Sequence, residues 1–185
     1  MPRWKLDYDP SHLYFTTTTA IHRAHLFKRD VIRRLIVDVR DTVRILRSLE
    51  LYAFVVMPNH VHFIVQCTPE YTISDLMRES KSSVANRIVW QYQAEGNQKV
   101  LQFLREAVQR PDKQRYQVWD EGYDTKDVFS PDFLREKMEY THNNPTQPQW
   151  QLVERTEEYV WSSARFYLLR EPALIPLSDA TPLLI

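Results

Sequence analysis

The chain has 185 residues, 43% of them hydrophobic, which suits one compact domain with its own core. Its 24 basic and 24 acidic residues cancel, whereas proteins that bind long duplex DNA non-specifically are usually more basic. Single Cys67 excludes an intramolecular disulfide and a multi-cysteine zinc site. With no signal peptide and no apolar run of membrane-spanning length, we expect a cytoplasmic protein that does not contact membranes.

The first third of the chain predicts a strand, a helix and a hairpin. Residues 12–19, "HLYFTTTT", are β-branched and aromatic, as in a strand. Apolar residues at helical spacing predict an amphipathic helix over 28–48. The runs 51–57 and 60–66 predict two further strands, because the turn dipeptide Pro58-Asn59 separates them.

The rest of the chain predicts mainly helices. One is expected over 72–93, with Trp90 on its apolar side, and a shorter one within 95–115. Residues 116–124, "YQVWDEGYD", indicate a fourth strand or an irregular extended segment. Ser130-Pro131-Asp132 is typical of a helix start, and Pro145 should end that helix at Asn143 or Asn144.

The predicted order is β-α-β-β-α-(α)-β-α. It favours an α+β fold, the ferredoxin-like split βαβ arrangement with a central antiparallel sheet and helices packed on it. We expect residues 1–170 to form this single domain and residues 171–185 to form a proline-containing C-terminal tail.

The segment "MPNHVHFIV" (57–65) holds two histidines one residue apart in an apolar run. Alternation along a strand puts His60 and His62 on one face and the core residues Val61 and Phe63 on the other. Two imidazoles on one face can be half of a divalent-metal site. They can also be hydrogen-bonded groups on a polar sheet face, and the strand alone favours that interpretation.

The helix "SPDFLREKMEYTHNNP" (130–145) aligns Phe133, Lys137, Tyr140 and Asn144 along one stripe, next to a more apolar one. Tyr140 and Asn144 could therefore bring a nucleophile and a metal-ligating amide oxygen to one place. The alternative is that Tyr140 packs against the core and the two asparagines simply end the helix. The helix alone favours this alternative.

Taken together, these segments resemble a known family. The motifs "AFVVMPNHVHFIV", "LMRESKSSVANRI", "VWDEGYD", "MEYTHNNP" and "YVWSS" follow one another as in the REP-associated tyrosine transposases. These belong to the single-tyrosine transposases with an HUH motif, in which a bulky apolar residue separates two histidines. The resemblance covers about residues 10–168. It departs from the family after Pro145, where the usual basic residue and glycine are replaced by "TQPQWQLV".

The resemblance implies a ferredoxin-like fold and a set of roles. His60 and His62 match the metal-ligand pair, Asn144 the third ligand and Tyr140 the nucleophile. The implied activity is DNA transposition, in which single-stranded DNA with palindromic hairpins is nicked and transferred through a 5′-phosphotyrosine intermediate. The implied cofactor is a divalent metal, Mg²⁺ or Mn²⁺, and the protein would act as a monomer or a homodimer.

Several basic residues are candidates for DNA contact. Arg78, Lys81 and Arg87 lie on the polar side of the 72–93 helix, and Lys137 and His142 lie on the helix that carries Tyr140. The N-terminal segment Arg3-Trp4-Lys5 combines cations with an aromatic ring that could stack on a base. The alternative is that these are ordinary solvated charges. Trp119 and Trp161 are expected in the core.

Three alternative functions remain open from the sequence. The same fold and motif serve replication initiators and conjugative relaxases, which nick DNA at an origin. A domesticated protein that binds hairpin DNA without catalysis would keep the fold. An unrelated metal-dependent hydrolase would need an acidic ligand near the histidines, and Asp124 is its one candidate.

Overall fold

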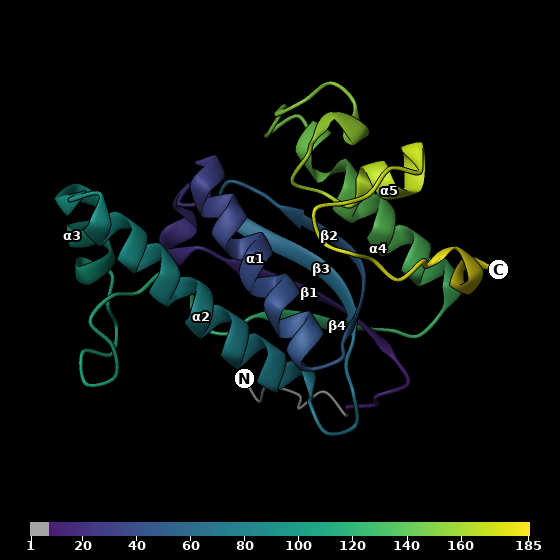
Figure 1. Ribbon diagram of the computed structural model, residues 1–185, viewed down its shortest axis with the longest axis horizontal. Coiled ribbons are helices and arrows are strands. Elements are labelled where there is room, and N and C mark those ends of the chain that lie inside the picture. The colour runs from purple at the N-terminus through teal and green to yellow at the C-terminus, as the bar shows by residue number, and fades with distance from the viewer. Residues whose placement is uncertain (1–7) are drawn as a thin grey trace.

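The computed structural model describes residues 8–185, so the Arg3-Trp4-Lys5 candidate lies outside the described residues. Its centre is an antiparallel sheet with the strand order β2-β3-β1-β4 (Figure 1). The strands are β1 (Leu13–Thr19), β2 (Glu50–Val56), β3 (His60–Gln66) and β4 (Asp124–Val128). Each strand pairs antiparallel with its neighbours in the sheet. Along the chain, helices lie between β1 and β2 and between β3 and β4. This topology confirms the predicted ferredoxin-like α+β fold.

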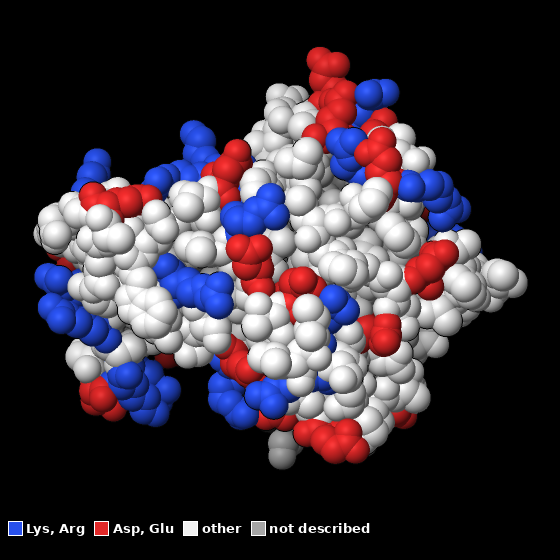
Figure 2. All heavy atoms as spheres, in the orientation of Figure 1, with Lys and Arg blue, Asp and Glu red and all other residues white. Residues whose placement is uncertain are grey.

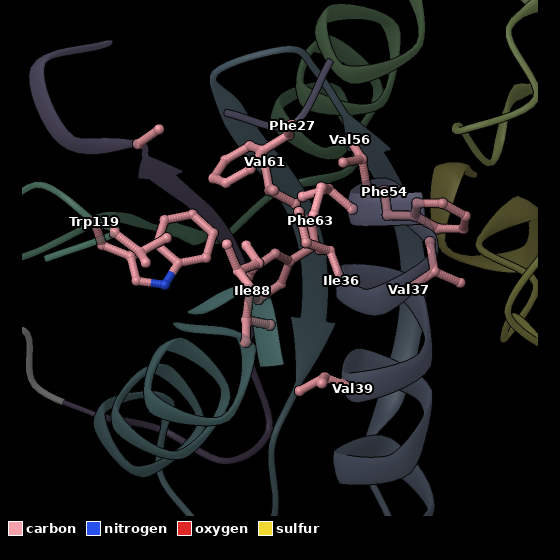
Figure 3. Packing of buried hydrophobic residues seen from close by; sticks show 14 of the residues in the cluster. Phe27, Ile36, Val37, Val39, Phe54, Val56, Val61, Phe63, Ile88 and Trp119 are labelled. Carbon is pink, nitrogen blue, oxygen red and sulfur yellow. The ribbon is translucent and has the colours of Figure 1, made fainter. Parts of the chain in front are cut away.

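Helices cover both faces of the sheet. Helices α1 (Asp30–Leu46) and α2 (Ile73–Ala94) pack on one face, and α4 (Pro131–Asn143) packs on the other (Figure 1). Shorter helices α3 (Gln98–Glu106) and α5 (Ala164–Leu169) lie outside these layers. The larger core lies under α1 and α2, where Val61 and Phe63 of β3 meet Ile36 of α1 (Figure 3).

The smaller core on the opposite face positions α4. Phe15 of β1 and Ile64 of β3 pack there with Leu134 and Met138 of α4. Phe15 and Ile64 are directly paired across the two strands, so they lie on the same face of the sheet. The helix that carries Tyr140 is therefore held against the face on which His62 lies.

Local signals explain where the helices begin. Thr72 caps α2 through a reciprocal capping box with Asp75. The Ser130 hydroxyl accepts a hydrogen bond from the Phe133 amide at 3.2 Å, and Pro131 takes the first turn of α4. The predicted start and end of α4 are both confirmed, since a short 3-10 turn (Asn144–Thr146) follows it.

Of the two alternatives for 116–124, the structure has the irregular segment over 116–123, apart from a bridge between Trp119 and Ala20, and the fourth strand begins only at Asp124. One residue differs from the sequence-based expectation. Trp90, expected on the apolar side of α2, is 65% exposed. Trp119 and Trp161 are buried, as predicted.

Residues 171–185, expected as a tail, run back along β2 and α4. The Ser178 amide donates to the Leu51 carbonyl at 2.9 Å, and Ile175 is buried in the larger core. The division into a domain and a tail stays a prediction. Within residues 8–185, no helix is both long enough and apolar enough to cross a membrane.

Candidate active site

His60 and His62 project from β3 on the face predicted from strand alternation. Across the strand pair, Thr19 is the partner of His60 and Thr17 is the partner of His62. The two imidazole rings have centroids 4.7 Å apart. They therefore form one cluster of nitrogen donors at the end of β3 nearest the hairpin turn.

A separate neighbour orients each ring through its Nδ1 atom. The Nδ1 of His60 is 2.7 Å from the Asn59 Oδ1, and the Nδ1 of His62 is 2.8 Å from the Thr17 Oγ1. With Nδ1 engaged in this way, the Nε2 of each ring is the atom left for a further ligand. The Nε2 of His62 is buried and has no hydrogen-bond partner among the described residues.

Helix α4 brings Tyr140 and Asn144 to the same place. The centroid of the Tyr140 ring lies 5.2 Å from that of the His62 ring and 6.0 Å from that of the Phe15 ring. Tyr140 is 49% exposed. Asn144 lies beside His60 and is only 4% exposed. Its Oδ1 is buried and makes no hydrogen bond within the described part of the chain.

Both histidines are held neutral. Burial is the main cause that lowers the pKa of His60 to about 4, and the charge of Arg23 acts in the same direction while Asn144 opposes it. Burial also lowers the pKa of His62 to about 3, assisted by His60 and the charge of Lys137. At neutral pH both rings are thus in the form that binds metals.

The donors fit a divalent ion. Two neutral imidazole nitrogens and an amide oxygen converge, and two of the atoms concerned are buried polar atoms with no partner in residues 8–185. Such atoms are costly unless something satisfies them. Over the same residues, no three His, Cys, Asp or Glu side chains gather as a metal site, which leaves the amide oxygen of Asn144 as the candidate third ligand. Asp124, the candidate acidic ligand, is exposed on the edge strand and does not supply one.

The cluster opens into a cleft of about 310 Å³. The cleft is lined by the site residues and by Thr17, Thr19, Arg23, Asn59, Gln149 and Trp150. The Trp150 ring lies 5.6 Å from His60 and 5.6 Å from His25. Trp150 comes from the segment that departs from the family pattern, and sequence reasoning gave it no role. The sequence also did not indicate Thr17 and Arg23, because their proximity to the histidines depends on strand register and loop packing.

Lys137 and His142 are placed differently along α4. The Lys137 Nζ lies over the rings of Phe133, Phe15 and Tyr140, at 4.8, 5.7 and 5.9 Å from their centroids. Its positive charge is therefore next to Tyr140, although it also pairs with Glu136. His142 is buried on another side of the helix, where its Nε2 is 2.8 Å from the Ser163 Oγ.

The candidate DNA-binding residues on α2 lie apart from the cleft. Arg78 is exposed and pairs with Asp75, and Arg87 is exposed. Lys81 is partly buried and donates hydrogen bonds to the carbonyls of Asp120 and Gly122. None of these three cations lines the cleft that holds Tyr140.

Comparison with known proteins places the chain among transposases. A family model described as transposase IS200 like matches residues 10–128. This range contains both histidines but ends before α4. No curated protein has a sequence that matches the chain.

Two solved structures resemble the fold. A REP-associated tyrosine transposase bound to a REP hairpin superposes with a TM-score of 0.67 at 18% identity, covering 98% of this chain and 94% of the other. A candidate transposase from Deinococcus radiodurans has a TM-score of 0.47 at 21% identity, covering 74% and 93%. At these identities the likeness concerns the fold.

Proposed function

The chain belongs to the IS200-like transposase family, and we propose that it cleaves and rejoins single-stranded DNA through a covalent bond to Tyr140. One observation carries this proposal: Tyr140 of α4 lies against the histidine pair of β3, with Asn144 one helical turn further along. Tyr140 and Asn144 thus line one cleft with His60 and His62, which lie about eighty residues earlier in the sequence. This arrangement supports the roles of nucleophile and metal ligands.

His60, His62 and Asn144 would hold the metal, Mg²⁺ or Mn²⁺. Imidazole ligands favour Mn²⁺ by affinity, and cellular abundance favours Mg²⁺. When bound, the ion supplies positive charge that offsets the negative charge of the phosphate and of the leaving oxygen. All three ligands are uncharged, so the protein does not reduce that charge.

Tyr140 has the exposure that attack on DNA requires. Its hydroxyl gives up a proton, and the oxygen forms a bond to phosphorus while the bond to the 3′ oxygen breaks. The departing 3′ oxygen takes up a proton, which leaves a 5′-phosphotyrosine link and a free 3′-hydroxyl. Lys137 places a positive charge next to the ring during this step.

The phosphotyrosine bond keeps the energy of the original phosphodiester. A 3′-hydroxyl of another DNA end can attack it, which releases Tyr140 and restores a phosphodiester without ATP. The enzyme then transfers a strand, whereas hydrolysis by water would discard the bond. Arg23, on the rim of the cleft, is in place to contact a phosphate oxygen.

We further propose that the substrate is hairpin DNA with single-stranded flanks. The fold is similar over nearly the whole chain to a transposase that was solved with a REP hairpin. All four site residues of one chain already meet, so the proposal requires no side chain from a second copy and holds for a monomer or a homodimer.

A covalent-adduct assay tests the proposal. The protein is incubated with Mg²⁺ or Mn²⁺ and single-stranded hairpin oligonucleotides from its own genomic neighbourhood, then denatured and run on a gel. We expect a labelled protein–DNA adduct that Tyr140→Phe abolishes. DNA binding without any adduct would instead favour the non-catalytic hairpin-binding alternative. An adduct formed equally well by Tyr140→Phe would exclude Tyr140 as the nucleophile.

A further inference from the structure

A hollow larger than the cleft that holds Tyr140 lies away from the proposed active site. It is a groove of about 710 Å³ between α2 and the segment 110–122. This segment follows α3 and lies beside α2 (Figure 1). The α2 wall includes Lys81, Asn86 and Trp90. The opposite wall includes Arg110, Lys113 and Arg115.

The charge of this groove differs from that of the whole chain. Four cations line it against two carboxylates, Asp120 and Glu121, in a chain with no net charge. Arg110, Lys113 and Arg115 are exposed and take part in no salt bridge within residues 8–185. Basic side chains also gather at the end of the molecule formed by α3 and this segment (Figure 2). These charges are free to neutralise phosphates.

The groove also presents aromatic rings. Trp90 is 65% exposed, although Ile88 and Val89 beside it are buried. Tyr116 lies opposite, with the guanidinium groups of Arg105 and Arg115 over its ring at 5.6 and 5.7 Å. An exposed indole in a groove that cations also line is a combination suited to unpaired bases and their phosphates.

We infer that this groove binds a single-stranded segment of the DNA substrate, outside the active site. Phosphates would contact Arg110, Lys113 and Arg115, and a base would stack on Trp90. The inference rests on the proposed function, because it takes the same DNA as its ligand. It adds a second contact surface, formed by α2 and the 110–122 segment.

The hollows of the surface connect this groove to the cleft. A neighbouring hollow of about 300 Å³ shares Asp120, Glu121 and Gly122 with the groove, and shares Thr17 and Thr19 with the cleft that holds Tyr140. A strand that leaves the cleft can therefore reach the groove along the surface. The carboxylates at the junction repel phosphates, so the backbone contacts are expected in the groove itself.

Lys81 positions the far wall. Its Nζ donates to the carbonyls of Asp120 and Gly122, and the Trp119 indole donates to the Lys81 carbonyl at 3.0 Å. These bonds fix the end of the 110–122 segment to α2. Lys81 is thus a positioning residue, and the exposed cations are the contacts.

Fluorescence anisotropy on two labelled oligonucleotides tests the inference. One is a hairpin with single-stranded flanks and the other is the same hairpin without flanks, and all variants carry Tyr140→Phe to prevent cleavage. Replacing Arg110, Lys113 and Arg115 by Ala should weaken binding of the flanked hairpin and reduce its salt slope by about 2, since each single-strand phosphate contact contributes roughly 0.7. Trp90→Ala should weaken it by about 5- to 150-fold, and Trp90→Phe by less.

Matched controls distinguish the effect of the groove residues on DNA binding from a general effect of removing surface charge or an exposed apolar side chain. Lys28, Arg34 and Arg170 are exposed cations outside the groove, and Leu168 is an exposed apolar residue. Alanine at these positions should leave the affinity and the salt slope close to those of the parent.

Three outcomes would overturn the inference. The groove variants could bind the flanked hairpin like the controls, or lose affinity equally for the hairpin without flanks, which would assign the groove to duplex DNA. If the protein with Tyr140 intact still forms its covalent adduct, either of these binding results contradicts the inference about the groove and leaves the proposed function standing. Absence of both DNA binding and adduct in the unmodified protein would contradict the proposed function as well.

Discussion

The orientation of the two imidazoles of the site depends on the hydrogen bonds of their Nδ1 atoms with neighbouring residues. Thr17 and Asn59 each contact an Nδ1 atom, which fixes the orientation of the ring and leaves Nε2 for a ligand. Because His62 is buried, loss of the Thr17 hydroxyl would leave the His62 Nδ1 without a hydrogen-bond partner and away from water, which is energetically unfavourable.

We therefore predict that Thr17→Val weakens divalent-metal binding by roughly ten- to a hundred-fold, as is typical when the partner of a ligating histidine is lost. Calorimetric titration with Mn²⁺ measures this, and the rate of adduct formation should fall with it. Thr42→Val, on the exposed side of α1, is the control. Unchanged Mn²⁺ affinity in Thr17→Val would show that the hydrogen bond does not position His62.

At this scale the sequence predicted the face of each histidine and the stripe that joins Tyr140 to Asn144. Both follow from periodicities within one element. It did not predict Thr17, Arg23 or Trp150, since their positions depend on how separate segments pack. The buried atoms of His62 and Asn144 that lack a hydrogen-bond partner among residues 8–185 likewise become visible only in three dimensions.

At the scale of elements, the site depends on how α4 is attached to the sheet. Leu134 and Met138 bury one stripe of the helix against Phe15 and Ile64, and Ser130 caps its first turn. The packing sets the distance from Tyr140 to β3, and the cap stabilises the helix that carries it.

Loss of the cap should destabilise the protein. Ser130→Ala removes the acceptor of the Phe133 amide and is expected to lower the free energy of unfolding by about 1 kcal/mol. Urea denaturation followed by circular dichroism measures this. Ser82→Ala lies within α2 and should not destabilise, because alanine is the better helix former. Equal effects of the two substitutions would argue against capping by Ser130.

The elements that the sequence predicted best are those with strong periodicity or punctuation. The bounds of β3 agree residue for residue, because Pro58-Asn59 and the apolar alternation mark both of its ends. For residues 116–124 the sequence left a strand and an irregular segment open, and 116–123 is irregular apart from one bridge. The strand β4 that follows was not predicted beyond Asp124, since its sequence "DTKDV" is polar and pairs only with β1 at the sheet edge. Trp90 was placed on the apolar side of α2, but it is 65% exposed, whereas Ile88, Val89 and Tyr92 of the same part of the helix are buried.

For the whole molecule, the uneven covering of the sheet creates the site. Helices α1 and α2 bury one face, whereas α4 covers only part of the other and leaves the hairpin end of β3 open (Figure 1). The buried part keeps the histidines neutral, and the open part is where the proposed function places a strand of DNA. The topology was predictable from the order of elements, but the extent of this covering was not.

An ion pair also joins the ends of the two helices on the covered face. Arg29 precedes α1 and donates two hydrogen bonds, of 2.6 and 2.8 Å, to Glu95 at the end of α2. Arg29 is the main cause that lowers the pKa of Glu95 to about 2, below its ordinary value of 4.5.

This pair predicts a dependence of stability on pH. A carboxylate whose pKa is lower in the folded state stabilises the protein above its unfolded pKa, and the effect is lost as the pH falls through the folded value. The parent should therefore lose stability between about pH 4.5 and pH 2, and Glu95→Gln should lose less over that range. Thermal melts at several pH values measure the difference, with Glu106→Gln as the control. Identical pH profiles for the parent and Glu95→Gln would show that the pair is not formed in solution.

The central claim is that Tyr140 and the histidine pair form one catalytic site, and the identity of the DNA linkage tests it most directly. The covalent adduct is digested with a protease, and mass spectrometry locates the modified residue and the DNA end. The account predicts a nucleotide joined through its 5′ phosphate to Tyr140, formed only with a divalent metal and abolished by His62→Ala. A link to another residue, a link through a 3′ phosphate, or an unchanged yield in His62→Ala would contradict it.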